Sequence, residues 1–447
     1  MRGARPINAD VPVKAPRQEA ARPRPELKPA PAPPPVRRRR RRQAAWAPKL
    51  IAALVLVAIG FIVLAIVGGS NGPQEEVAAV PGPAPSAARE GGSGSGDPQS
   101  AEALGFPGFA TGNTTRVGGA DPTANAAAVA LAAFPSRTAD QRPAAVTLVD
   151  EDDWAGGIAA AVLMAAPVRA PVLISAAGEA PAITAEAVAA LAPRGDDSTA
   201  GAGAIAIGGV AAPVAGKVTR VAAGSAAAEA ARIARLRDRL TGSAPAHIVL
   251  ASAAQPAFAM PAAGWAARSG DPVLFAAADS LPAETAAYLQ RHPGVPVYVL
   301  GPSSAISSEV VREAAAIGNA VKRVAGESPV ANAIALARYR DGRFGWNVND
   351  PGHGFVVARD EQPLDAAAAA PLSASGTWGP LLLTDDAATL PAELRSYFLD
   401  VKPGYTDNPT RAFYNHVWVI GDQEAIDVNQ QAEANQLAEL TRIGGES

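Results

Sequence analysis

The stretch TRVGGADPTANAAAVALAAF, which begins at Thr115, decides the fold because two later stretches repeat it. They are TRVAAGSAAAEAARIARL from Thr219 and KRVAGESPVANAIALARY from Lys322. The arginines at the same place in the three openings are Arg116, Arg220 and Arg323, spaced by 104 and 103 residues. A period this long indicates duplicated domains rather than the short units of a solenoid.

Each copy contains the same parts in the same order after its opening and its Ala-rich helical segment. A β-rich run comes first (AVTLVD from 145, HIVLAS from 247, GFVVAR from 354), then a Pro-led strand (PVLIS from 171, PVLFA from 272, PLLLT from 380). The last part is a strand that ends on glycine (AIAIGG from 204, VYVLG from 297, VWVIG from 417). Short apolar runs without polar alternation are typical of parallel strands buried on both faces. We therefore predict three small α/β domains with parallel sheets.

The expected domains cover residues 106–219, 220–322 and 323–428, and a C-terminal helix and tail cover 429–447. Each opening carries a helix start signal. Asp121, Ser225 and Ser328 share one register, and prolines follow two of them, which predicts a helix N-cap with proline at the first helical position. The third copy contains an insertion, VKPGYTDNPTRAFYNH, before its last strand.

The N-terminal part has a different character. Residues 1–49 hold 14 Lys and Arg against 3 Asp and Glu, whereas the rest of the chain holds 25 against 39. Leu50 to Val67 is an uninterrupted apolar run of 18 residues, preceded by six arginines at 37–42. This pattern predicts a transmembrane helix over 50–68 with the N-terminus in the cytoplasm. We expect a disordered Pro/Arg-rich cytoplasmic tail over 1–49 and a flexible Gly/Ser/Pro linker over 69–105.

Two other interpretations of this part stay open. A cleaved signal peptide has a similar order of charged and apolar residues, although 49 residues is long for its basic region. The arginine run could contact nucleic acid, but beside an apolar helix it favours an orientation signal that also contacts anionic lipid. We expect a single-pass cell-membrane protein whose body faces the wall, and no nucleic-acid partner.

The repeat unit resembles the cell wall-binding repeat 2 family of bacterial envelope proteins. The matching features are the Arg-x-x-Gly openings, the DAAAAAP segment from Asp365, the LPAE stretches from Leu281 and Leu390, and the Gly-ended last strand. The resemblance covers residues 115–428. It implies three α/β domains around a pseudo-threefold axis that bind anionic wall polymers non-covalently.

The chain departs from the family pattern at two places. Where the family carries a second arginine after the opening glycine, this chain has Pro122-Thr123 and, in the later copies, Ala226-Ala227 and Pro329-Val330. In the Asp-Ala segment, Asp365 keeps the acid and Asp153 corresponds to it, whereas the second copy has Gln255.

The candidate ligand-binding residues are therefore Arg116, Arg220, Arg323, Asp153 and Asp365. Guanidinium groups that converge between three domains could neutralise the phosphate or carboxylate groups of a polymer. The competing interpretation, which we favour, is that each arginine pairs with an acid within its own domain near the start of a strand. Acidic runs at 150–153, 360–361 and 385–386 follow strands and could hold a hard cation, although solvated loops are the simpler interpretation.

No catalytic motif is present in the sequence. The four histidines lack metal-site spacing, there is no cysteine, and no nucleophile elbow, P-loop or dinucleotide loop occurs. We expect a non-enzymatic protein without cofactor or metal that binds an anionic cell-wall polymer or peptidoglycan. Two alternatives remain: an envelope scaffold that binds a protein partner, and a degenerate wall-active hydrolase.

Overall fold

The computed structural model describes residues 112–375 and 379–444. All of them belong to one compact unit, Ser93–Ser447. In this described part, no helix is long and apolar enough to cross a membrane. The tail, transmembrane helix and linker that the sequence predicts over 1–105 lie outside the described residues.

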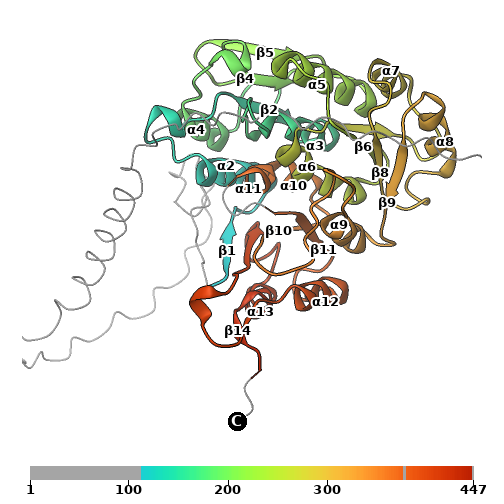
Figure 1. Cartoon of the computed structure of the whole chain (residues 1–447). Helices are drawn as coiled ribbons and strands as arrows, with labels where there is room; N and C mark the ends of the chain where they lie inside the picture. Colours follow the sequence, from blue (N-terminus) through green and yellow to red (C-terminus); the bar gives the residue numbers. More distant parts are fainter. Residues whose placement is uncertain (1–111, 376–378, 445–447) are drawn as a thin grey trace, which may run out of the picture. The chain divides into compact units, whose positions relative to one another are not determined.

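The described residues contain three four-stranded parallel sheets with the same strand order, which confirms the predicted α/β repeats (Figure 1). The first sheet has the order β3 (Val172–Ser175), β2 (Val146–Asp150), β4 (Ala202–Ile207), β5 (Lys217–Val221). The second has β7 (Val273–Ala276), β6 (Ile248–Ser252), β8 (Val297–Leu300), β9 (Val321–Val324). The third has β11 (Leu381–Thr384), β10 (Gly354–Arg359), β13 (His416–Ile420), β1 (Thr114–Val117). The two central strands of each sheet are mostly buried, as their apolar runs predict, although His416 and Trp418 of β13 are half-buried.

The Arg-Val opening of each repeat is a strand that pairs with the sheet of the preceding repeat. Arg220 on β5 lies opposite Ala206 on β4, and Arg323 on β9 lies opposite Val299 on β8. The first opening has no preceding repeat, and its strand β1 pairs instead with β13, with Arg116 opposite Val419. Figure 1 shows β1 among the strands of the last repeat. The repeats are therefore joined head to tail in a closed ring.

The helices fall into sets that repeat with the strands. The opening helices are α2 (Pro122–Ala133), α5 (Ala226–Thr241) and α9 (Pro329–Arg338). The helices after the first β-rich strand are α3 (Trp154–Ala160), α6 (Pro256–Ser269), α10 (Pro363–Ala368) and its continuation α11 (Ala370–Ala374). The helices after the Pro-led strand are α4 (Ala182–Leu191), α7 (Ala283–Arg291) and α12 (Ala392–Asp400).

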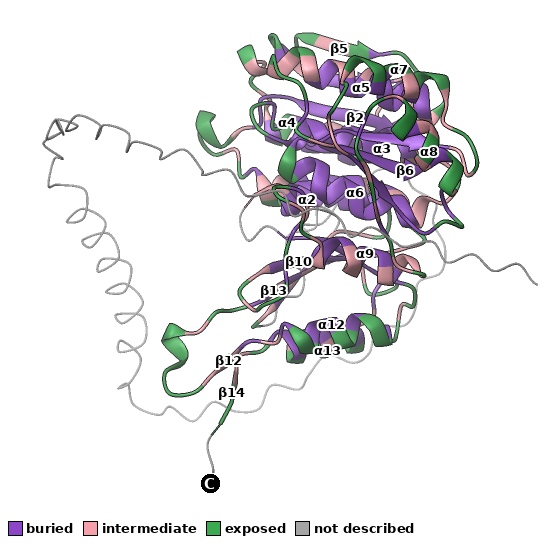
Figure 2. Ribbon diagram, turned by 45° about the vertical axis from the view of Figure 1, so that its right-hand side comes forward, coloured by how far each residue is buried: buried purple, intermediate pink, exposed green. Residues whose placement is uncertain are grey.

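The middle of this unit is built by α3, α6 and α10, which pack on one another. Figure 2 shows α3 and α6 in the colour of buried residues. Small side chains allow this close approach: Gly157 of α3 lies against Leu364 and Ala367 of α10. Three equivalent helices in mutual contact are what a pseudo-threefold arrangement requires.

The predicted helix starts are confirmed. Asp121, Ser225 and Ser328 are the N-caps of α2, α5 and α9, and each side chain accepts a hydrogen bond from the amide three residues later. Pro122 and Pro329 occupy the first helical position, where the missing N–H group is not needed.

The repeats differ after their last central strand. The second has α8 (Ser308–Ala316) before β9, and the third has α13 (Val428–Ala438) at the same place. The first repeat connects β4 to β5 without an α-helix. The insertion of the third repeat carries β12 (Gly404–Tyr405), which pairs with β14 (Thr441–Arg442) near the C-terminus.

Candidate functional site

Arg116 is 6% exposed, and backbone carbonyls of the loop that follows β13 surround it. Its Nη1 donates to the carbonyls of Gly421 and Asp422, and its Nη2 donates to that of Ile426. Its Nε donates to Oε1 of Gln431 on α13, at 3.1 Å. Burial lowers the pKa of Arg116, and the Asp422 and Asp427 carboxylates oppose that shift. The guanidinium group therefore fastens the loop between β13 and α13.

Arg323 makes two equivalent contacts in the second sheet. Its Nη1 donates to the carbonyl of Gly301 at 2.7 Å, and its Nη2 to that of Ile306 at 2.8 Å. Gly301 and Ile306 occupy the positions of Gly421 and Ile426 in the equivalent loop. Burial lowers the pKa of Arg323.

Arg220 differs because the first repeat has a shorter connection after its last central strand. It is exposed, and its Nη1 donates to the carbonyl of Val210 at 3.0 Å. The three arginines lie in three different sheets, and no hydrogen bond or ion pair joins any two of them within the described residues. The contacts agree with a structural role near a strand, but the partners are backbone carbonyls rather than acids.

Asp153 forms a carboxyl pair with Glu229 of the following repeat. Asp153 is the N-cap of α3, where its Oδ1 accepts from the amide of Gly156 at 2.8 Å. A Cβ atom at Gly156 would lie 2.0 Å from Oδ2 of Asp153, so the glycine leaves room for this carboxyl group. Glu229 on α5 is 4% exposed, and its carboxyl group interacts with that of Asp153.

The surroundings of this pair favour its neutral form. Burial, together with repulsion from Asp153, raises the pKa of Glu229 to about 7, against the attraction of Arg232. Burial also raises the pKa of Asp153, and Asp150 adds to that shift. Two carboxyl groups in contact cannot both ionise without a large repulsion, so the pair retains a proton near neutral pH.

Asp365 of the third repeat pairs with Asn125 of the first. Asn125 on α2 is 3% exposed and donates from Nδ2 to Oδ1 of Asp365 at 2.8 Å. Oδ1 of Asn125 accepts from the amide of Gly119, in the turn before its own helix. Asp365 is 1% exposed, and burial raises its pKa to about 7.

Asn332 completes the set between the second and third repeats. Its Nδ2 donates to the backbone carbonyl of Phe258 on α6 at 3.2 Å, and its Oδ1 accepts from the amide of Gly326. Phe258 and Asp365 are each the third residue of their helix. The three contacts between neighbouring repeats are therefore equivalent. In each, the residue four positions after the N-cap of an opening helix contacts the start of the central helix of the preceding repeat.

The sequence interpretation identified Asp153 and Asp365 but not their partners. Asn125, Glu229 and Asn332 lie four residues after the three N-caps, in the strings DPTAN, SAAAE and SPVAN. This register was the signal that could have revealed them. A buried amide or acid at one helical position in three copies indicates a repeated polar contact.

The acidic runs do not assemble into a metal centre in the described part of the chain, where no group of three or more His, Asp or Glu side chains could hold an ion. Asp150 accepts from the amide of Asp152, and Asp386 accepts from those of Ala388 and Thr389. These carboxylates order their own turns.

The described fold is similar to two solved structures. Cwp8 from Clostridium difficile matches with a TM-score of 0.55 at 22% identity, and Cwp6 from the same organism with 0.57 at 20%. Each match covers 73% of this chain, but only 52% of Cwp8 and 48% of Cwp6, so the chain spans about half the length of either protein. No family model and no curated protein matches the sequence. The likeness concerns the fold.

Proposed function

We propose that the three-repeat body is the wall-binding module of an envelope protein and holds a cell-wall polymer non-covalently. The observation that carries this proposal is the ring of three parallel sheets, which has the fold of Cwp8 and Cwp6. Both are cell wall proteins, which fits the resemblance of the repeats to the cell wall-binding repeat 2 family. We further propose that the apolar run at 50–68 anchors the chain in the membrane with the body outside.

Among the five candidate residues, Arg220 is the one we propose for contact with the polymer. It is exposed, and one hydrogen bond leaves most of its donors open to solvent. The guanidinium groups of Arg116 and Arg323 donate hydrogen bonds to loop carbonyls. Asp153 and Asp365 interact with side chains of other repeats.

Co-sedimentation tests the proposal. The full chain, kept in mild detergent, is mixed with cell walls before and after acid removal of phosphodiester-linked polymers, with and without a chelator. Sedimentation that is lost on stripping supports a polymer receptor, and equal sedimentation with stripped walls moves the target to peptidoglycan. No sedimentation with either preparation would sink the proposal.

The third repeat favours a second candidate function, a scaffold that binds a protein partner. Phe413 and Tyr414 in the insertion are 68% and 55% exposed, and Ile443 beside them is 56% exposed. Phe413 and Ile443 line a hollow of about 370 Å³ whose other walls come mostly from the insertion, β12 included. Exposed apolar side chains gathered in one place are typical of a protein contact.

Wall sedimentation and partner capture together separate the two functions. In the scaffold, the parent chain does not sediment with walls, and Phe413→Ser combined with Tyr414→Ser abolishes capture of envelope proteins. In the wall-binding module, the same variant has no effect on sedimentation while Arg220→Gln weakens it.

A further inference from the structure

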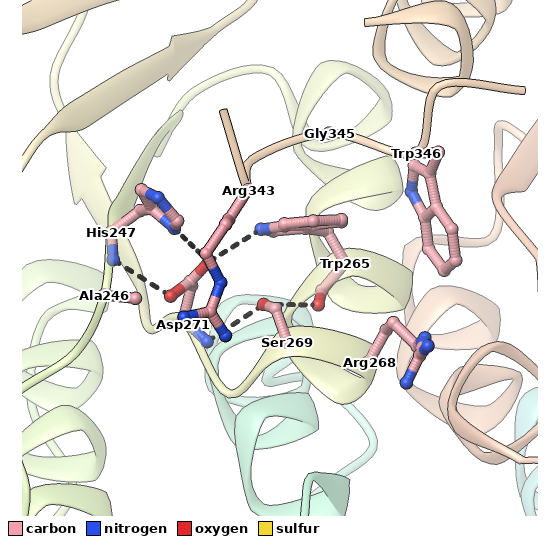
Figure 3. A pocket seen from close by; sticks show the side chains of 9 residues that line it. All are labelled: Ala246, His247, Trp265, Arg268, Ser269, Asp271, Arg343, Gly345 and Trp346. Atoms are coloured by element: carbon pink, nitrogen blue, oxygen red, sulfur yellow. Dashed lines mark hydrogen bonds and ion pairs between the residues drawn. The ribbon is translucent and has the colours of Figure 1, made fainter. Parts of the chain in front are cut away.

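A pocket of about 370 Å³ opens where the second repeat meets a loop of the third, away from the joints described above (Figure 3). It lies at the amino ends of β6 and β7. Its lining includes His247, Trp265 and Arg268 from the second repeat, with Arg343 and Trp346 from the third.

Asp271 holds the inner wall of this pocket in place. Its Oδ2 accepts from Nε1 of Trp265 at 3.0 Å and lies 3.0 Å from Nδ1 of His247, while its Oδ1 accepts from the His247 amide. Asp271 is 1% exposed. The oxygens of the Asp271 carboxylate are therefore occupied by groups of the protein, and little of the carboxylate faces the opening of the pocket.

The outer wall is a loop with a fixed conformation. Asp341 and Phe344 exchange backbone hydrogen bonds, and the Phe344 ring stacks on Tyr298 at 3.6 Å between centroids. Gly345 has a φ of +95°, and a Cβ atom there would lie 2.2 Å from the Tyr339 carbonyl, so this turn requires glycine. Val348 returns the loop to the end of α9 by donating to the carbonyl of Ala337.

This rigid loop presents Arg343 over the pocket. Arg343 is exposed, and it makes no hydrogen bond or ion pair with another described residue. Arg268 adds a second guanidinium group from the last turn of α6. A preorganised loop that carries an uncommitted arginine is suited to bind an oxyanion, since the fork geometry matches carboxylate and phosphate oxygens.

The electrostatic balance at the opening is positive. The C-terminus of α6 contributes about half a negative charge, which opposes an anion. The Asp271 carboxylate also lines the pocket, but its oxygens are occupied by Trp265 and His247. The Arg343 guanidinium group, which makes no ion pair with another described residue, carries a full positive charge that outweighs the half charge of the helix end, and Arg268 adds a second guanidinium group. The indoles of Trp265 and Trp346, 5.6 Å apart and nearly perpendicular, give the pocket an apolar wall beside these charges.

The pocket belongs to one place in the ring rather than to every repeat. At the position of Trp265 in the central helix, the other repeats carry Leu163 and Leu372. At the position of Asp271, they carry Ala170 and Gly379. Neither Ala170 nor Gly379 has a side chain that could accept hydrogen bonds from an indole and an imidazole. The pocket with these two rings therefore occurs in the second repeat and not at the equivalent positions of the other two.

We propose that this pocket binds a sugar unit that carries a negative charge, with Arg343 and Arg268 on its phosphate or carboxylate and the indole wall against its ring. The proposal rests on the proposed function, because such units are part of anionic wall polymers. It adds a defined subsite, at the amino ends of the second sheet.

Calorimetric titration of the full chain tests the subsite with glucose 1-phosphate, glucuronate and neutral glucose as probes. We expect saturable binding of one or both charged sugars and none of glucose, with a change in tryptophan fluorescence. The tighter charged probe identifies whether phosphate or carboxylate is the preferred group. Arg343→Gln should weaken that binding at least about tenfold, which is about 1.4 kcal/mol.

Arg312→Gln on α8 is the matched control, since it removes the same charge from a side chain that is 71% exposed outside the pocket. It should bind as the parent chain does. Binding that Arg343→Gln leaves unchanged, or no saturable binding of either charged sugar up to about 10 mM, overturns the subsite.

Wall sedimentation separates this proposal from the proposed function. If the parent chain and Arg343→Gln sediment equally with walls and neither binds a charged sugar, the subsite is overturned and the wall-binding proposal stands. A parent chain that binds a charged sugar but does not sediment supports the subsite and overturns the wall-binding module.

Discussion

At the scale of single residues, the joint between the first two repeats contains a carboxyl pair whose proton affects stability. The pKa of Glu229 is raised from 4.5 to about 7 by burial and by Asp153. The folded chain therefore keeps a proton that the unfolded chain releases at a lower pH. This contribution to stability is full below pH 4.5 and is lost as the pH rises through about 7.

Glu229→Gln should flatten this dependence, because glutamine stays neutral and can donate to Asp153 at every pH. The parent chain should lose at most about 1.4 kcal/mol per pH unit from this group across the window. Urea midpoints from pH 4.5 to 8 measure the effect, with the exposed Glu284→Gln as control. Identical slopes for Glu229→Gln and the parent would show that the pair carries no proton linkage.

Asp365 offers a second prediction because its partner is a neutral amide. Asp365→Ala leaves Nδ2 of Asn125 buried without its acceptor, and we expect a loss of about 2–3 kcal/mol at about pH 4, where the folded parent keeps the Asp365 carboxyl group protonated. Asp365→Asn keeps an acceptor oxygen and should change the stability by less than about 1 kcal/mol. Equal losses for both variants, measured by urea unfolding, would contradict this account.

The pH dependence of Asp365 should have the same sign as that of Glu229. Its pKa is raised from 3.8 to about 7 by burial, so its contribution is present at low pH and declines toward pH 7. Because asparagine stays neutral, Asp365→Asn should gain stability relative to the parent as the pH rises from 3.8 to about 7, and the difference should stay constant above that. Asn125→Ala removes the partner side chain. The double variant Asp365→Ala with Asn125→Ala should lose less unfolding free energy than the sum of the two single losses.

At the scale of elements, the apolar runs allowed the nine central and Pro-led strands to be predicted, and capping residues gave the starts of three helices. The pairing of the opening strands could not be read in the same way. Arg116 and Arg220 lie in similar openings, so their local sequence does not distinguish them. Which strand each opening pairs with depends on which sheet has a free edge, and the sequence does not indicate where that edge is. The carbonyls that receive Arg116 lie about 305 residues away in the chain.

Arg116 and Arg220 should consequently respond differently to substitution. Arg116→Met leaves several loop carbonyls and Gln431 without their donor in a buried place, and we expect a loss of about 3 kcal/mol or more. Arg220→Met removes one hydrogen bond from an exposed side chain and should cost about 0.5–1 kcal/mol. Equal costs in urea unfolding would refute the structural role of Arg116.

At the scale of the whole described unit, the first strand in sequence is an edge strand of the last sheet. The equivalent edge position of the second sheet is occupied by β9, which follows α8 in the chain: α8 ends at Ala316 and β9 begins at Val321. In the third repeat α13 ends at Ala438, and the place of β9 is taken by β1 from the other end of the body. The chain should therefore tolerate transfer of β1 to its C-terminal side.

The test compares two variants of the full chain that both lack residues 113–119. In one of them these residues are attached again after Ala438, through a connection as long as that between α8 and β9. The permuted chain should unfold cooperatively in urea and elute as the parent does in gel filtration. The deleted chain exposes the edge of β13 and loses the arginine that holds the following loop, so it should aggregate or unfold at lower urea. A deleted chain as stable as the parent would show that β1 does not close the ring.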